Sequence, residues 1–174
     1  PEKVVEEIKD SDAFAPRPYE CTILFSDFIG FTRLAENISG EMLVDILNRV
    51  FVSFDELIAA HKGTKIKTIG DAYMAVFGAP DKLENHAVYG VRAGLALQEF
   101  LLDFNRENKS NLQMRVGIHT GIVMAGVVGR ERMQFDVFGD AVNVASRFES
   151  SGEAGEVNIS ETTYLQAGSL FAYR

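Results

Sequence analysis

Apolar and polar residues follow two different periods along the chain, and each period predicts one kind of element. Apolar side chains recur every three or four residues in three segments long enough for helices, at about 41–60, 84–104 and 140–149. Shorter apolar runs bounded by turn residues are typical of strands, at 21–25, 64–69, 72–77, 112–119, 122–128 and 157–160. The predicted order is βαββαβ with additional elements. It favours an α+β fold with a ferredoxin-like core, in which helices pack on an antiparallel-rich sheet.

Two dipeptides are expected to form tight turns between paired strands. Gly70-Asp71 separates the second predicted strand from the third, and Thr120-Gly121 separates the fourth from the fifth. A glycine paired with a short polar residue fits a hairpin turn. We therefore expect two hairpins in the sheet.

The first 18 residues have a pattern of their own. A short helical stripe is formed by Val4, Val5 and Ile8. Pro16 and Pro18 then break the chain and make residues 11–19 a linker. Because so short a helix rarely holds alone in water, residues 1–18 are interpreted as the end of an upstream transmitter segment. Residues 19–174 are then the main domain.

Composition and charge narrow the classes of function. With 174 residues, 47% of them hydrophobic, the chain can bury one sizeable core. The formal charge of −8 argues against binding to nucleic acid or to anionic lipid. The single Cys21 lies in an apolar run and fits a reducing compartment. No apolar run reaches the roughly 20 residues of a membrane span. We expect a cytoplasmic domain whose parent is either soluble or tethered to a membrane.

Two aspartates are the most informative polar residues. Asp27 follows the first predicted strand and Asp71 lies in the first predicted hairpin, and in a ferredoxin-like sheet these positions are neighbours. Two adjacent carboxylates repel each other unless a divalent cation neutralises them, and Mg²⁺ binds one or two carboxylates together with substrate phosphates. Two such ions would suit an in-line displacement at phosphorus. A lone aspartate in a turn often has only a turn role, so the prediction depends on the combination of both.

The segment after Asp27 supports this interpretation. Gly30 allows a tight turn, and the backbone amides that follow can point at phosphate oxygens. Other familiar signatures are absent from the sequence, including a G-x-x-x-x-G-K-[ST] loop, an HExxH helix and a G-x-S-x-G elbow. His119 is a candidate general base by residue type, but its mid-strand place between glycines favours a packed or hydrogen-bonded histidine.

Four ordered blocks closely resemble those of class III adenylyl and guanylyl cyclases: SDFIGFT (26–32), KIKTIGDAYMAVFG (65–78), MRVGIHTGIVMAGVVG (114–129) and FDVFGDAVNVASRFES (135–150). The likeness runs from about residue 19 to 165. It implies a homodimer with composite active sites at the interface, acting on a nucleoside triphosphate. The pattern of residues 1–18 adds the expectation of an upstream sensor or transmitter region in a longer parent protein.

The resemblance also implies roles for the matched residues. Asp27 and Asp71 match the aspartates that bind Mg²⁺ or Mn²⁺, two ions per site, and the carbonyl of Phe28 would complete one metal shell. The substrate-binding loop would comprise Phe28, Ile29, Gly30, Phe31 and Thr32. From the other protomer, Lys67 and Asp136 match the positions that read the base, Asn143 the residue that orients the ribose, and Arg147 the arginine that stabilises the transition state. Arg115 matches an arginine near the terminal phosphates.

The choice of base can also be argued from chemistry. Adenine offers an acceptor at N1 and a donor at its N6 amino group, which a lysine and an aspartate complement. Guanine presents donors at N1–H and its 2-amino group, and guanylyl members of the family carry Glu and Cys where this chain has Lys67 and Asp136. The pair therefore favours ATP. Lys65 lies two residues from Lys67 and is expected on the same strand face, and both lysines could instead be solvated strand charges.

Asn143 and Arg147 are four residues apart, so they share a helix face. Arg147 either meets the α-phosphate as charge builds there, or merely pairs with an acidic neighbour such as Glu149 or Asp140. Family members usually carry a triphosphate-contacting lysine in a hairpin beyond the position of Arg174, so we expect part of the catalytic domain to be missing from the sequence given. Alternative interpretations are a guanylyl cyclase, a catalytically inactive cyclase-like dimerisation module, and a diguanylate cyclase, whose Gly-Gly-acidic-acidic-Phe hairpin is not found.

Overall fold

The computed structural model describes residues 1–11, 13–129 and 132–174. The strands are β1 (Arg17–Ile29), β2 (Thr64–Ile69), β3 (Ala72–Phe77), β4 (Gln113–Val128), β5 (Gln134–Phe138) and β6 (Val157–Ile159). The helices are α1 (Glu2–Ser11), α2 (Phe31–Asn37), α3 (Gly40–Ala60), α4 (His86–Asn108), α5 (Asp140–Ser150), α6 (Glu161–Ala167) and the 3₁₀ turn η1 (Gly168–Leu170). The α+β prediction is confirmed.

Strand β1 is the centre of the sheet. The strand order is β2-β3-β1-β4-β5, with all these neighbours antiparallel, and β6 pairs parallel to β4. Along its 13 residues β1 pairs with β4, from Arg17 opposite Ala125 to Ile29 opposite Gln113. The first four strands therefore have the spatial order of the predicted ferredoxin-like core.

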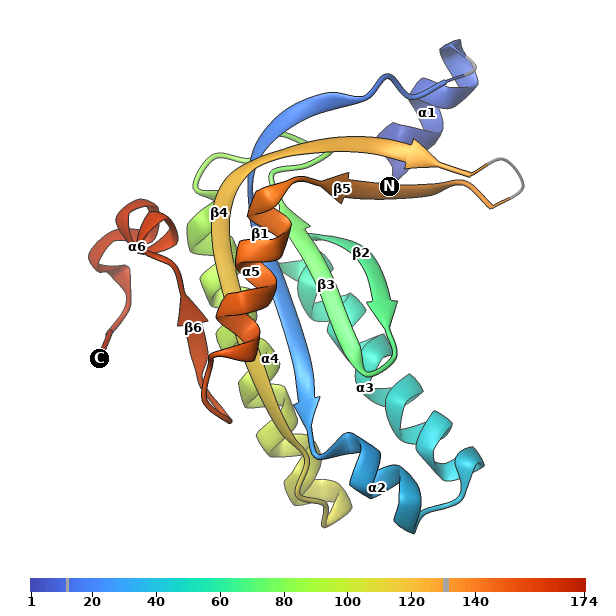
Figure 1. Cartoon of the computed structure of the whole chain (residues 1–174), viewed down its shortest axis with the longest axis vertical. Coiled ribbons are helices and arrows are strands. Elements are labelled where there is room, and N and C mark those ends of the chain that lie inside the picture. Colours follow the sequence, from blue (N-terminus) through green and yellow to red (C-terminus); the bar gives the residue numbers. More distant parts are fainter. Residues whose placement is uncertain (12, 130–131) are drawn as a thin grey trace.

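Helices cover both faces of the sheet (Figure 1). Because successive side chains of a strand point to opposite faces, Leu24 and Phe28 of β1 pack with the apolar side chains of α3 and α4. Cys21 and Ile23 instead pack with α5 on the other face. The core thus consists of two apolar layers separated by the sheet, and Cys21 is a fully buried core residue.

The predicted turn at Thr120-Gly121 is wrong. Strand β4 continues through it without a break, with Thr120 opposite Thr22 and Gly121 opposite Cys21. The glycine serves packing and not a turn, because a side-chain carbon at position 121 would lie 3.0 Å from the Cβ atom of Ala141 on α5. Glycine in a strand often marks such a close approach.

The N-terminal segment is a helix, as its apolar stripe predicts, but the predicted linker is too long. Strand β1 begins at Arg17, and Pro18 pairs with Met124 inside the sheet. Val4 is buried against the apolar layer on the α5 side, whereas Val5 is exposed. Helix α1 is thus packed on the sheet of its own chain. The short helix α2, which follows the glycine turn, was not predicted.

Helix α5 lies unusually close to β4 at Gly117. A side-chain carbon there would lie 2.0 Å from the backbone nitrogen of Glu149, closer than any side-chain carbon can approach. Gly117 also pairs with Phe25 in the centre of the sheet. The position of α5, and of every side chain on it, therefore depends on this one missing side chain.

We predict that Gly117→Ala lowers the free energy of unfolding by about 2 kcal/mol or more, because α5 must move away from β4. Gly126→Ala in the same strand is the matched control, since its added carbon would meet nothing closer than Pro16 at 3.7 Å. Urea unfolding followed by circular dichroism measures both. Equal stability of the two variants would contradict the close approach.

Candidate active site

Asp27 and Asp71 meet at one end of the sheet. Asp27 of β1 is opposite Ala72, the residue that directly follows Asp71 in the chain. Gly70 has a φ of 60° and forms the β2–β3 turn together with Asp71. Partial burial, the charge of Asp71 and a hydrogen bond with Asp71 contribute to raising the pKa of Asp27 to about 6. The two carboxylates are thus neighbours, as the sequence predicts.

Arg115 lies between this pair and helix α5. It is opposite Asp27 on β4, and its Nη2 is 3.7 Å from Asp27 Oδ2. Its Nε donates a hydrogen bond to Oε1 of Glu149 at 2.9 Å. The charge of Arg115 opposes the rise in the pKa of Asp27, while that of Glu149 adds to it. Within one chain Arg115 therefore stabilises the charged form of Asp27. The phosphate contact that the resemblance implies for Arg115 would be an additional role.

The acidic group suits a hard divalent cation. Asp27, Asp71 and Glu149 gather around one guanidinium, which pairs with Asp27 and Glu149, and burial together with the two neighbouring carboxylates raises the pKa of Asp27. No cluster of three or more His, Cys, Asp or Glu side chains in the described part of the chain is arranged to hold a metal by itself. The two aspartates would need further oxygen ligands, such as a backbone carbonyl and phosphate oxygens, and Mg²⁺ is bound in this way.

Lys67 and Asp136 also meet, although their strands are at opposite ends of the sheet order. Nζ of Lys67 donates to Oδ2 of Asp136 at 2.6 Å. Gln134, also on β5, donates to the carbonyl of Ile66 on β2 at 3.5 Å. The sheet is therefore curled so that β5 reaches across to β2. A lysine donor and a carboxylate acceptor lie side by side as a result.

A β-bulge at Ile66 turns Lys67 toward Asp136. Lys65 is opposite Ala75 and Lys67 is opposite Met74, so the register shifts by one residue between them. A bulge of this kind re-aims the side chains that follow it. Lys65 binds Asp55 of α3, whereas Lys67 binds Asp136 of β5. The expectation that both lysines share a strand face is therefore wrong.

Asn143 and Arg147 project from α5 into solvent. Both residues are exposed, and they share a face as predicted. Within the described residues, Arg147 forms no ion pair with Glu149 or Asp140. Glu149 is two residues further along the helix, about 200° around its axis, and points inward to Arg115. Arg147 therefore faces away from the acidic group of its own chain.

The segment from Phe28 to Thr32 combines a buried aromatic anchor with an open backbone. The ring of Phe28 is buried and stacks on Phe31 at 5.7 Å between centroids. Gly30, with a φ of 69°, precedes the first turn of α2, and no side chain caps the amides of that turn. Ile29, Gly30 and Thr32 are exposed. The amides predicted to meet phosphate are thus accessible.

The chain has extensive similarity to known proteins. A family model described as the adenylate and guanylate cyclase catalytic domain matches residues 15–172. Adenylate cyclase type 9 of Xenopus laevis is 42% identical over 144 residues, covering 83% of this chain and 11% of that protein. Guanylate cyclase soluble subunit beta-2 of Rattus norvegicus is 40% identical over 166 residues, covering 94% and 24%. This chain belongs to the adenylate and guanylate cyclase catalytic domain family.

A solved structure agrees with this assignment. The catalytic core of a rhodopsin-guanylyl cyclase with converted specificity, in complex with ATPαS, has a TM-score of 0.86 and 35% identity. The match covers 90% of this chain and 86% of that one. The cyclase domain spans only about a tenth to a quarter of the two relatives' lengths. Within its described residues, no helix has the length and apolar character to cross a membrane. Because the relatives are of both kinds, the choice between ATP and GTP has to be argued from the site.

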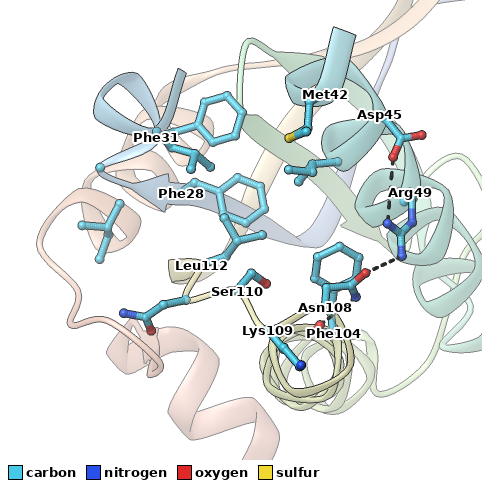
Figure 2. A pocket seen from close by; sticks show the side chains of 15 residues that line it. Phe28, Phe31, Met42, Asp45, Arg49, Phe104, Asn108, Lys109, Ser110 and Leu112 are labelled. Atoms are coloured by element: carbon cyan, nitrogen blue, oxygen red, sulfur yellow. Dashed lines mark hydrogen bonds and ion pairs between the residues drawn. The ribbon is translucent and has the colours of Figure 1, made fainter. Parts of the chain in front are cut away.

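A cavity of about 540 Å³ adjoins the segment from Phe28 to Phe31 (Figure 2). Phe28, Phe31, Met42 and Phe104 line it, and Arg49 at its rim bonds to Asn108 at 2.8 Å. It lies on the α3–α4 side of β1, because Phe28 and Asp27 point to opposite faces of that strand. Neither the aspartate pair nor the Lys67–Asp136 pair lines it. The cavity thus shares Ile29 and Gly30 with the exposed loop but contains neither polar pair.

Glu149 is the site residue that sequence analysis missed. It was considered only as an acidic neighbour for Arg147, yet its side chain is 10% exposed and holds Arg115 beside Asp27. A signal was present in the cyclase sequence. Glu149 continues the inward stripe of Ala141 and Ala145 at a spacing of four residues, and a charged residue on such a stripe needs a partner. His119, by contrast, is packed and hydrogen-bonded as expected, with Nδ1 2.8 Å from Oγ of Ser160.

Proposed function

We propose that this domain converts ATP into 3′,5′-cyclic AMP and pyrophosphate. The observation that carries the proposal is the contact of 2.6 Å between Lys67 and Asp136, which presents one donor and one acceptor side by side. Adenine needs this combination, because N1 accepts and the N6 amino group donates. Guanine would place its N1–H donor against the lysine, leaving buried polar groups mispaired at a large cost in rate.

The reaction is an intramolecular displacement. The ribose 3′-oxygen loses its proton and bonds to the α-phosphorus, and the bond from that phosphorus to the pyrophosphate oxygen breaks. Asp27 and Asp71 would hold Mg²⁺ or Mn²⁺, with the carbonyl of Phe28 as a further ligand. When bound, two such ions supply activation of the attacking oxygen and charge neutralisation on the leaving group. The amides around Gly30 would receive phosphate oxygens.

The remaining groups act by positioning and by charge. Arg147 would meet the α-phosphate as negative charge develops, and Asn143 on the same helix face would orient the ribose. Because Arg147 points about 200° away from Glu149 around α5, it cannot readily serve the acidic group of its own chain. We therefore propose a homodimer in which each site takes its metal ligands from one protomer and Lys67, Asp136, Asn143 and Arg147 from the other. In the parent protein an upstream region would control the arrangement of the two protomers.

Two alternatives are weaker. A guanylyl cyclase is disfavoured by the Lys67–Asp136 contact. A catalytically inactive dimerisation module would be expected to have lost an essential group, whereas the chain keeps Asp27, Asp71 and Arg147. Turnover of a nucleoside triphosphate in the presence of a divalent metal separates the inactive module from the enzyme.

The first prediction concerns turnover itself. Purified domain incubated with ATP and Mn²⁺ should yield cyclic AMP and pyrophosphate, identified by chromatography. Asp27→Asn or Asp71→Asn should reduce the rate by at least about a hundredfold, because each removes a charged ligand of the metal with little change in size. Asp103→Asn, at an exposed ion pair on α4, is the matched control and should retain full activity. Near-normal activity of either site variant, with its fold intact by circular dichroism, would reject the metal assignment.

The second prediction concerns the base. Lys67→Glu combined with Asp136→Cys should weaken the use of ATP and admit GTP, because the donors and acceptors of the site then suit guanine. The measurement is the ratio of kcat/KM for the two nucleotides, which should shift by at least about a hundredfold. A folded double variant that keeps the ratio of the wild type would show that these residues do not read the base.

The third prediction tests the shared site. Asp27→Ala and Arg147→Ala should each inactivate both sites of a homodimer. In a mixed dimer one site collects both lesions and the other collects neither. Random exchange makes about half of the dimers mixed, so activity should recover to roughly a quarter of that of the wild type under two-fold symmetry. Recovery should increase with protein concentration, because dimers form by mass action.

Mass spectrometry under native conditions supplies the control for that experiment, since it shows directly whether subunits have exchanged. Exchange without recovery of activity would mean that each chain carries its own complete site. The interface assignment would then be wrong.

A further inference from the structure

Two lysines of β2 are held on opposite faces of the sheet by two aspartates. Nζ of Lys65 lies 2.9 Å from both carboxylate oxygens of Asp55 on α3. Nζ of Lys67 lies 2.6 Å from Oδ2 of Asp136 on β5. Between them is the bulge at Ile66, whose side chain is buried in the apolar layer on the α5 side. The bulge is therefore anchored at three successive residues.

Asp55 also binds a second partner. The hydroxyl of Tyr73 donates a hydrogen bond to Asp55 Oδ1 at 2.7 Å, and the Tyr73 side chain is fully buried. Nζ of Lys65 lies 5.3 Å from the centre of the same ring. Tyr73 is on β3, opposite Thr68 of β2. Asp55 thus connects α3 to both strands of the hairpin that carries Lys67 and Asp71.

The face on which Lys67 emerges depends on where the bulge sits. A shift of pairing by one residue moves a side chain to the other face of a sheet. If the bulge were lost or moved, Lys65 and Lys67 would share one face, and one of the two lysines would leave its aspartate. The Asp55–Lys65 contact fixes the residue before the bulge on the α3 face, so the bulge stays at Ile66 and the backbone that carries Lys67 is held from both sides.

We propose that Asp55 and Lys65 are positioning residues for recognition of the base, acting through the bulge at Ile66 on the orientation of Lys67. This inference rests on the proposed function, in which Lys67 and Asp136 read adenine. Neither Asp55 nor Lys65 touches the nucleotide, since both lie on the opposite face of the hairpin from Lys67. They determine selectivity from that face.

The test uses Lys65→Ala and Asp55→Asn in the intact domain. The asparagine keeps an oxygen that can accept from Tyr73 but lacks the charge that holds Lys65. Each variant should lower the ratio of kcat/KM for ATP over GTP by about tenfold, because a small displacement of a positioned group is costly. The loss should appear mainly as a higher KM for ATP, with kcat at saturating ATP within about twofold of that of the wild type. Lys65→Arg retains the ion pair and should restore selectivity.

Asp45→Asn is the matched control on the same helix, where Asp45 forms an exposed ion pair with Arg49 at 3.9 Å. It should leave KM, kcat and selectivity unchanged. An unchanged ratio in Lys65→Ala and Asp55→Asn would overturn the proposal. So would an equal loss with ATP and GTP carried by kcat, because that result indicates general damage to the fold. If Asp55→Asn does not fold, Lys65→Ala alone decides, since Lys65 is partly exposed and its truncation leaves no buried charge.

A parallel measurement separates this proposal from the proposed function. If Lys67→Ala keeps the wild-type ratio of kcat/KM for ATP over GTP, the base assignment is wrong. Selectivity then gives no information about the orientation of Lys67. The register is then read by nuclear Overhauser contacts between Lys67 and Met74, which are opposite each other in the sheet. Their loss in Lys65→Ala would support the positioning role, and their persistence would overturn it.

Discussion

The rest of the structure depends on the pairing of β1 with β4 and on the close packing of α5 against β4 at Gly117. Thirteen residues of β1 are paired with β4, so Asp27 and Arg115 are fixed opposite each other. The absence of a side chain at Gly117 lets the backbone of Glu149 come close enough for its carboxylate to reach Arg115. One antiparallel ladder and one glycine therefore bring together three elements around a single aspartate.

This arrangement produces an acidic group whose charge is incompletely balanced. Arg115 is engaged by both Asp27 and Glu149, while Asp71 approaches from the hairpin, and the pKa of Asp27 rises to about 6. A protein pays for such a group in stability unless a cation occupies it. The arrangement therefore has a plain physical explanation if the domain binds a divalent metal together with a nucleotide.

The second polar group depends on the curvature of the sheet and not on pairing of neighbours. β2 and β5 are separated by three strands in the sheet order, yet strand twist and the long, curved β4–β5 ribbon (Figure 1) bring the two strands within reach of each other. Asp136 therefore contacts Lys67. The bulge at Ile66 completes this contact by turning Lys67 to the face opposite Lys65. The proposed recognition of the base would thus depend on a local irregularity in an edge strand, with Asp55 binding Lys65 on the opposite face.

Much of this protein could be predicted from its sequence, because local pattern decides local structure. The period of apolar residues located α3, α4, α5 and the hairpin β2–β3 to within a few residues, and the order of elements predicted that Asp27 and Asp71 would be neighbours. Features that depend on packing between distant segments could not be obtained in this way. Gly121 is a residue type typical of turns, but in this strand its lack of a side chain makes room for Ala141 of α5. Pro18 resembles a linker residue but pairs with Met124 of β4. The face of Lys67 was mispredicted because strand period alone assumes regular pairing, and the inward role of Glu149 became visible only once α5 was placed against Arg115. Sequence by itself determined which residues carry charge and where the elements lie, whereas the tertiary structure decided which charges meet, because those contacts join residues from distant parts of the chain.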